Sequence, residues 1–349
     1  MWPSTSVPQT GFRCPKRMTY GPCGGVRSDG GCEMAASPCE FGELAHLPPV
    51  PAPTAPPRPV DVPLVLTDLS VPPRDAATLT ATARRLVGSC AAVLLGDHQD
   101  RQDFPPTELA RLVADTGAQT WVTLACRDRD RAGLEAELRG LQEDGRATVL
   151  CVTGDGRAFD VRPEIPQVFD LEGIRLTQLA ASLGLPVAVP ETPTAPPVRL
   201  RPERLVRKQQ AGAGVAVLNH VRSAAEVDAF LTAARALGLT IPVVAAVAVY
   251  TDPRSAAVLT ALPGLEIEPA SVDAVLQAED PVAAGIAQAV AEARSLLAVD
   301  GVAGVNLSGM ASARSVAFAA DVQAEIGRQV LAGHRSAAKH GHQRVDRLP

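Results

Sequence analysis

Eight short apolar segments recur along most of this chain, and helix-like segments separate them. The apolar runs lie near residues 64–69, 91–95, 120–125, 147–152, 185–189, 214–218, 241–249 and 302–307. Segments rich in Ala, Leu, Glu and Arg lie between most of them, such as 75–87, 107–116, 131–144, 171–183, 201–211 and 223–237. Strand and helix alternating in this way is the pattern of parallel βαβ units, whose strands are buried on both faces.

The number of repeats favours one architecture. Eight such units within about 250 residues predict a (β/α)8 barrel, a TIM-like fold of the α/β class. A doubly wound open sheet is the alternative, but no Gly-x-Gly-x-x-Gly turn follows the first run. The gap between the seventh and eighth runs is roughly double the others, so we expect an additional helical segment near 270–298.

Composition divides the chain into four parts. Residues 1–45 hold few aliphatic side chains, many glycines and four of the seven cysteines. Residues 46–61 are too proline-rich for a helix or a central strand, and we expect an extended, semi-rigid linker. Residues 62–325 carry the barrel pattern, and residues 326–349 form a polar tail that we expect to be solvated and frayed.

Charge and composition limit the partners. A net charge of −5 and an aromatic content of 3% argue against nucleic acid and anionic membranes. No apolar stretch is long enough to span a bilayer, and the N-terminus lacks the pattern of a secretory signal. We therefore expect a soluble, cytoplasmic protein with a small-molecule ligand, whose cysteines are reduced rather than paired in disulfides.

Polar side chains gather where the predicted strands end. Asp155 follows the fourth run between two glycines, which allow a ligand to approach the backbone closely. Its simplest alternative role is to cap the next helix. Other residues that follow or end a run are Asp68, Asp97, His98, Thr123, Arg127, Asp128, Glu191 and Asn219. Because the carboxyl ends of barrel strands share one mouth, we expect the active site there.

Four cysteines near the N-terminus form a candidate metal site. Cys14, Cys23, Cys32 and Cys39 lie within 26 residues, separated by eight, eight and six residues. Thiolates suit tetrahedral zinc or an iron–sulfur cluster. A module with few aliphatic side chains has a small hydrophobic core and needs such a metal site to fold. The spacing lacks a Cys-x-x-Cys knuckle, so the metal identity is open, and scattered free thiols are the alternative.

Several short motifs together resemble methylenetetrahydrofolate reductase, most closely the branch found with corrinoid-dependent one-carbon metabolism. In family order and spacing, they are Pro72-Pro73-Arg74, Gly96-Asp97-His98-Gln99, and residues 124–131, 149–155, 168–171 and 205–213. The resemblance covers about residues 62–310. The cysteine pattern is similar to the small domain that accompanies such reductases, fused in some systems and part of a partner subunit in others.

The resemblance implies a barrel that binds a flavin, FAD or FMN, at its mouth. The flavin passes a hydride from NAD(P)H to methylenetetrahydrofolate, which gives methyltetrahydrofolate. On this basis Asp155 and Asp68 are the candidate catalytic residues, and Glu191 and Asn219 are candidates for substrate binding. The candidates for cofactor binding are Asp97, His98, Thr123, Arg127, Asp128, Arg207 and Lys208.

Some family positions differ in this chain. The family's catalytic glutamate corresponds to Leu69, one residue from Asp68, and a shift of one residue in a strand turns a side chain to the other face. Asp68 can serve only if an extra residue, such as Val71, is absorbed in a bulge or turn. Thr123 replaces a histidine, and Asn219 begins a segment that lacks the family's Gln-x-x-Phe-Asp.

These differences leave two hypotheses. The first, which we favour, is a working reductase that uses flavin or, with the flavin pocket lost, takes the hydride directly from the nicotinamide. The second is a catalytically silent relative that binds folate or flavin, or serves as a metal-bearing partner subunit in one-carbon metabolism. Whether the protein forms a homo-oligomer or needs a partner subunit stays open.

Overall fold

Eight parallel strands close into a barrel, which confirms the predicted architecture. The computed structural model describes residues 13–98, 100–157, 161–261, 265 and 267–345, with side chains described as far as residue 335. The strands are β1 (Val65–Leu69), β2 (Ala92–Leu95), β3 (Gln119–Ala125), β4 (Ala147–Val152), β5 (Val187–Glu191), β6 (Val215–Leu218), β7 (Val243–Ala248) and β8 (Val302–Ser308). Each strand pairs with the next, and β8 pairs with β1 to complete the ring.

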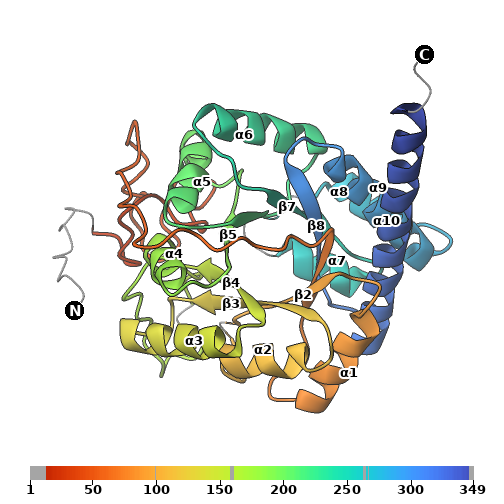
Figure 1. Cartoon of the computed structure of the whole chain (residues 1–349), viewed down its shortest axis with the longest axis horizontal. Coiled ribbons are helices and arrows are strands. Elements are labelled where there is room, and N and C mark those ends of the chain that lie inside the picture. The colour runs from red at the N-terminus through yellow and green to blue at the C-terminus, as the bar shows by residue number, and fades with distance from the viewer. Residues whose placement is uncertain (1–12, 99, 158–160, 262–264, 266, 346–349) are drawn as a thin grey trace.

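Helices surround the strands (Figure 1). They are α1 (Ala76–Leu86), α2 (Pro106–Ala114), α3 (Arg131–Asp144), α4 (Gly173–Ser182), α5 (Arg201–Gln210), α6 (Ala224–Ala236), α7 (Pro253–Thr260), α8 (Pro269–Leu276), α9 (Pro281–Leu297) and α10 (Val316–Val345), and the short 3-10 helix η1 (Val198–Leu200) precedes α5. The additional helical segment expected near 270–298 is α8 and α9. None of the helices in the described part of the chain has the length and apolar character needed to cross a bilayer.

Side chains alternate between the inside and the outside of the barrel. Leu66, Trp121 and Leu150 belong to a buried cluster within the ring of strands. Val65 and Leu69 instead belong to the larger cluster between the strands and the helices. Because the side chains of a strand alternate, this places every second residue of β1 inside the barrel.

The N-terminal residues and the proline-rich segment wrap the barrel from one end to the other. Figure 1 shows the segment that begins at residue 13 beside α4 and α5. From there, Pro51 O accepts a hydrogen bond from Gln178 Nε2 of α4 at 2.6 Å. Asp61 O then accepts from Gln119 Nε2, at the start of β3, at 3.0 Å. Val60, in the segment predicted to be a linker, and Val62 just after it pack against the cluster inside the barrel, so this stretch closes the end opposite the mouth.

Helix α10 crosses the boundary that the sequence placed at residue 325. The side chains of Ile326 and Val330 are buried, and the helix continues to Val345. Apolar residues four apart give the helix one apolar face, which packs against the barrel wall. The first turns of the segment predicted to be a polar tail are therefore part of the outer ring of helices.

Two glycines of α10 offer a test of this packing. A Cβ at position 327 would lie 2.1 Å from the backbone oxygen of Ser89, whereas a Cβ at position 333 would meet only the Arg294 side chain, at 3.3 Å. We predict that Gly327→Ala lowers the free energy of unfolding by about 1–3 kcal/mol through overpacking. Gly333→Ala should be neutral or raise it by up to about 1 kcal/mol through helix propensity. Urea unfolding measures both, and equal effects would contradict the packing described for α10.

Candidate functional site

A cavity of about 300 Å³ opens at the carboxyl ends of the strands. The apolar part of its lining includes Ala125, Leu150 and Val152 of β3 and β4. Seven of the residues predicted from the sequence for catalysis, cofactor binding or substrate binding also line it, namely Asp97, Thr123, Arg127, Asp155, Glu191, Lys208 and Asn219. The N-terminal residues add Lys16, Cys23 and Gly24. The mouth therefore combines an apolar floor with both signs of charge.

Arg127 offers this cavity a buried donor. Its side chain is 3% exposed, and its Nε donates to Asp128 at 3.1 Å. Its Nη2 lies 4.0 Å from Asp97 Oδ1 and has no hydrogen-bond partner among the residues that the structure describes. Asp97 is held in turn by Arg129, whose Nη1 donates to it at 2.7 Å. A buried guanidinium with an unused N–H favours a ligand that carries an acceptor oxygen or negative charge.

Asp155 lies on the loop that follows β4, and its side chain is exposed at the cavity. Gly154 has a φ of +88°, and a Cβ there would lie 3.2 Å from the Cβ of Arg127. Only glycine adopts that conformation readily in such close contact. The glycine therefore lets the loop fold over Arg127 and keeps Asp155 at the mouth.

Asp68 lies on the inward face of β1, above Leu66, whereas Leu69 packs outward. Its carboxylate accepts from Asn306 Nδ2 at 3.0 Å and from Gly309 N at 3.3 Å. Burial raises the pKa of Asp68, although both hydrogen bonds oppose the shift. Asp68 thus faces the barrel interior from β1, but it does not line the cavity, whose strand residues come from β3, β4 and β5. A raised pKa suits a proton donor.

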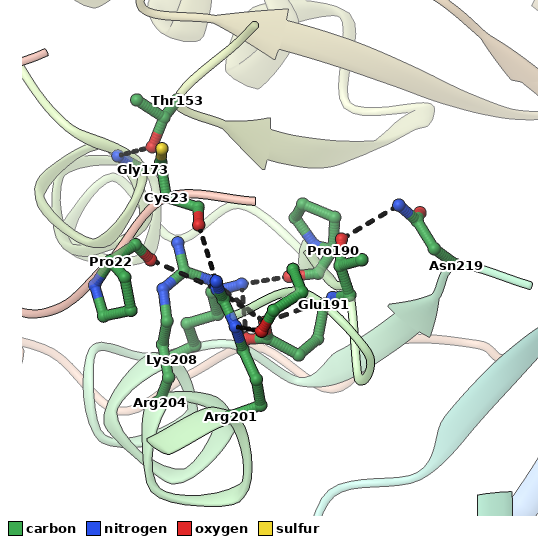
Figure 2. Close-up of polar contacts among 12 residues, drawn as sticks. Pro22, Cys23, Thr153, Gly173, Pro190, Glu191, Arg201, Arg204, Lys208 and Asn219 are labelled. Atoms are coloured by element: carbon green, nitrogen blue, oxygen red, sulfur yellow. Dashed lines mark hydrogen bonds and ion pairs between the residues drawn. The ribbon is translucent and has the colours of Figure 1, made fainter. Parts of the chain in front are cut away.

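Glu191 forms the centre of a buried charge cluster (Figure 2). The side chain is fully buried, and three cations of α5 approach it: Arg204 Nη1 and Lys208 Nζ at 2.9 Å and Arg201 Nη1 at 3.6 Å. Burial alone would raise the pKa of Glu191, but the attraction of Arg204, Lys208 and Arg201 lowers it to about 2. Both carboxylate oxygens are engaged by the protein's own cations, so Glu191 positions those cations beside the cavity.

The same surroundings also lower the pKa of Lys208, which for a lysine disfavours the charged form. Burial lowers its pKa to about 7, and repulsion by Arg204 adds to the shift while Glu191 opposes it. Its Nζ also donates to the backbone oxygen of Pro190. A lysine with such a pKa changes its charge near neutral pH, so the cavity wall gains or loses one positive charge there.

Four residues predicted for catalysis or cofactor binding, Asp68, His98, Asp128 and Arg207, do not line this cavity. Arg207 is on the outer side of α5, where its Nη2 donates to Glu203 at 2.9 Å and to Leu47 O at 3.1 Å. His98 instead lines a neighbouring cavity of about 350 Å³, with its Nε2 2.7 Å from Arg101 Nη2. Asp97 and Asp128 also line that second cavity, so Asp97 borders both. Gln99 of the motif lies outside the described residues.

Sequence reasoning missed Lys16, Arg201 and Arg204. The two arginines and Lys208 are spaced i, i+3 and i+7, which places three cations on one face of a helix, and this pattern was available in the sequence. Lys16 carried no comparable signal, because it reaches the mouth from a segment more than 100 residues away in the chain.

The four N-terminal cysteines surround a narrow cavity of about 30 Å³. All four thiols are free, and burial raises the pKa of Cys23 to about 11. Among the described residues, no three His, Cys, Asp or Glu side chains are arranged to hold a metal ion. The structure thus brings the predicted thiols together without forming a coordination site.

The Glu191 cluster predicts a pH-dependent stability. Removing one partner of a buried ion pair leaves the other charges uncompensated, so Glu191→Gln should lower the free energy of unfolding at pH 7 by roughly 3–5 kcal/mol. The pKa of Glu191 falls from 4.5 to about 2 on folding. The contribution of its carboxylate to the free energy of unfolding is therefore fully present above pH 4.5 and is lost as the pH falls through 2.

Urea unfolding at pH 7 and at pH 3 measures this effect. Glu226→Gln serves as the control, because Glu226 is exposed and lies 3.9 Å from Arg222 in a surface pair. If Glu191→Gln lowers the free energy of unfolding at pH 7 by no more than Glu226→Gln does, the stabilising role assigned to the Glu191 cluster is wrong.

Comparisons with known proteins bear on the family and the fold of this chain. The family model described as methylenetetrahydrofolate reductase matches residues 77–320. No curated protein matches the chain. One similar solved structure is an uncharacterized protein from Clostridium thermocellum that binds two copies of 5-methyl-5,6,7,8-tetrahydrofolic acid. It has a TM-score of 0.57 and 12% identity, over 77% of this chain and 95% of that chain.

A second similar structure is 2,3-dimethylmalate lyase, with a TM-score of 0.44 and 10% identity, over 81% of this chain and 82% of that chain. At these identities, the likeness to the Clostridium thermocellum protein shows a shared fold. The family model covers more than half of the chain, and it includes β2 to β8 with the mouth residues between them. This chain belongs to the methylenetetrahydrofolate reductase family.

Proposed function

We propose that this protein reduces methylenetetrahydrofolate to methyltetrahydrofolate with a hydride from NAD(P)H. The observation that carries the proposal is the mouth cavity, where Arg127, Asp155 and Lys208 surround an apolar floor. A pterin ring needs apolar contact and a few polar partners, and a folate tail carries carboxylates that cations bind. A folate ligand is further supported by the Clostridium thermocellum protein of similar fold, which binds a methylated folate.

The reaction needs a proton as well as a hydride. Protonation of a folate nitrogen opens the five-membered ring to an iminium, and the hydride then adds to the methylene carbon to give the methyl group. We assign the proton donor to Asp68, whose raised pKa favours the acid form. We assign to Asp155 the contact with the folate ring, because its exposed carboxylate lies at the cavity.

The residues at the mouth fit a flavin. The buried Nη2 of Arg127 is a donor without a described partner, and Thr123 adds a hydroxyl to the lining of the same cavity. Both suit the acceptor atoms of a flavin ring, while Arg101 and Arg129 of the neighbouring cavity suit its phosphates. When bound, FAD or FMN supplies a relay for the hydride between NAD(P)H and the folate.

One observation favours a second candidate function. Leu69 stands at the position of the family's catalytic glutamate and packs outward. If Asp68 does not replace that glutamate, the protein binds folate without reducing it. In that case methyltetrahydrofolate would bind, but NADH and NADPH would not be oxidised when methylenetetrahydrofolate is present, with or without added FAD.

The two carboxylates provide the test of the proposed reaction. Asp68→Asn should lower kcat by about 100-fold or more, the usual size of a lost acid contribution. Asp155→Asn weakens the contact that orients the folate, and it should lower kcat by about 100-fold as well. NAD(P)H oxidation with methylenetetrahydrofolate measures the rate, and the absorption spectrum of the purified protein reports bound flavin. Asp115→Asn is the control, because Asp115 is an exposed partner of Arg146 at the end of α2. Wild-type turnover in both site variants would show that the catalytic assignment is wrong.

We also propose that Cys14, Cys23, Cys32 and Cys39 hold one zinc ion or an iron–sulfur cluster. Their place around one small cavity supports this, since a metal displaces the thiol protons and draws the sulfurs together. The purified protein should contain zinc or iron in a fixed ratio, and chelation should lower its Tm. If the purified protein contains neither zinc nor iron and its Tm does not change on chelation, the proposed metal site is wrong.

A further inference from the structure

The loop that carries Asp155 is held from outside the barrel. Lys16 Nζ donates to Gly154 O at 2.6 Å. Glu33 Oε2 accepts from Gly156 N at 2.8 Å. The two residues of the N-terminal segment therefore bind the backbone on either side of Asp155, one to each flanking glycine.

Lys16 and Glu33 also bind each other. Lys16 Nζ lies 2.5 Å from Glu33 Oε1, and Lys16 is buried while Glu33 is half-buried. Cys23 Sγ approaches the same carboxylate oxygen at 3.3 Å. A buried ion pair is favourable only when its remaining donors and acceptors are satisfied, and here the loop backbone satisfies them.

Close packing between the N-terminal segment and the Asp155 loop accompanies these hydrogen bonds. A Cβ at Gly156 would lie 2.6 Å from Met34 Cγ, and a Cβ at Gly25 would lie 1.9 Å from Glu33 Oε1. Lys16 Nζ also lies 5.4 Å from the centre of the Phe169 ring, on the segment that leads from the loop to α4. Both glycines thus lack side chains where the N-terminal segment meets the Asp155 loop.

We propose that Lys16 and Glu33 are positioning residues for Asp155, so that the N-terminal module completes the active site of the barrel. The inference rests on the proposed function, in which Asp155 contacts the folate. A loop with glycine on both sides of its functional residue has many accessible backbone conformations. Clamping both glycines restricts them, and a shift of about 1 Å in a reacting group can cost about 100-fold in rate.

We call the contacts of Lys16 with Gly154 O and of Glu33 with Gly156 N the clamp. Hydrogen exchange tests it without relying on activity. Glu33→Ala removes the acceptor of the Gly156 N–H, so exchange in a peptide covering residues 153–157 should become at least 10-fold faster. Glu33→Gln keeps an acceptor oxygen but loses the charge that pairs with Lys16, and it should give an intermediate rate. Glu43→Ala is the control, because Glu43 is an exposed carboxylate of the same module. Wild-type exchange in both Glu33 variants, with Tm unchanged, overturns the proposal.

Kinetics then separate positioning from general destabilisation. Glu33→Ala and Lys16→Met should lower kcat by about 10-fold or more in protein that is still folded at the assay temperature. If they act through Asp155, adding Glu33→Ala to Asp155→Asn should cost little more than Asp155→Asn alone. Additive losses in the double variant would overturn the positioning role.

The outcomes distinguish this inference from the proposed function. If the wild-type protein does not reduce methylenetetrahydrofolate but Glu33→Ala loosens the loop, the proposed reaction fails and the clamp stands. If the wild type is active while Glu33→Ala leaves both exchange and kcat unchanged, the reaction stands and the clamp fails.

Discussion

Closure of the sheet is the constraint on which the rest of this structure depends. Once β8 pairs with β1, the sheet has no edge, and all eight carboxyl ends meet at one rim. Residues far apart in the sequence, such as Asp97, Asp155 and Asn219, then line one cavity. The alternation of side chains decides which of them face inward, and it places Asp68 inside the barrel and Leu69 outside.

The charges at the mouth depend on one buried carboxylate. Glu191 neutralises part of the charge of Arg201, Arg204 and Lys208, which could not otherwise be buried so close together. The cluster still holds more positive than negative charge, and Lys208 and Arg204 line the cavity. This excess of positive charge, beside Arg127, gives one wall of the mouth an affinity for anionic groups, while Asp97 and Asp155 supply carboxylates.

Much of the fold could be predicted from the sequence, because buried parallel strands leave apolar runs and the helices between them leave a different pattern. Residues at the strand ends were predictable for the same reason, and six of them line the cavity. Arg207 and Lys208 show the limit of this reasoning. They are neighbours in one helix, yet one faces the cavity and the other faces Leu47, and only the orientation of α5 decides which.

Contacts between segments far apart in the chain could not be predicted from the sequence. The proline-rich segment was predicted to be a linker, but the packing of Val60 makes its last residues part of the barrel's closed end. Lys16 contacts Gly154 and Glu33 contacts Gly156, and each contact joins residues more than 100 positions apart. No periodic pattern in the sequence predicts such contacts.

The most direct test is a crystal structure of the protein with 5-methyltetrahydrofolate. We predict that the pterin ring lies in the mouth cavity, within contact distance of Asp155 and Arg127, with the N-terminal segment forming one wall. A ligand bound elsewhere in a crystal whose mouth is open to solvent, or a barrel whose N-terminal segment lies away from the mouth, would contradict this description of the site.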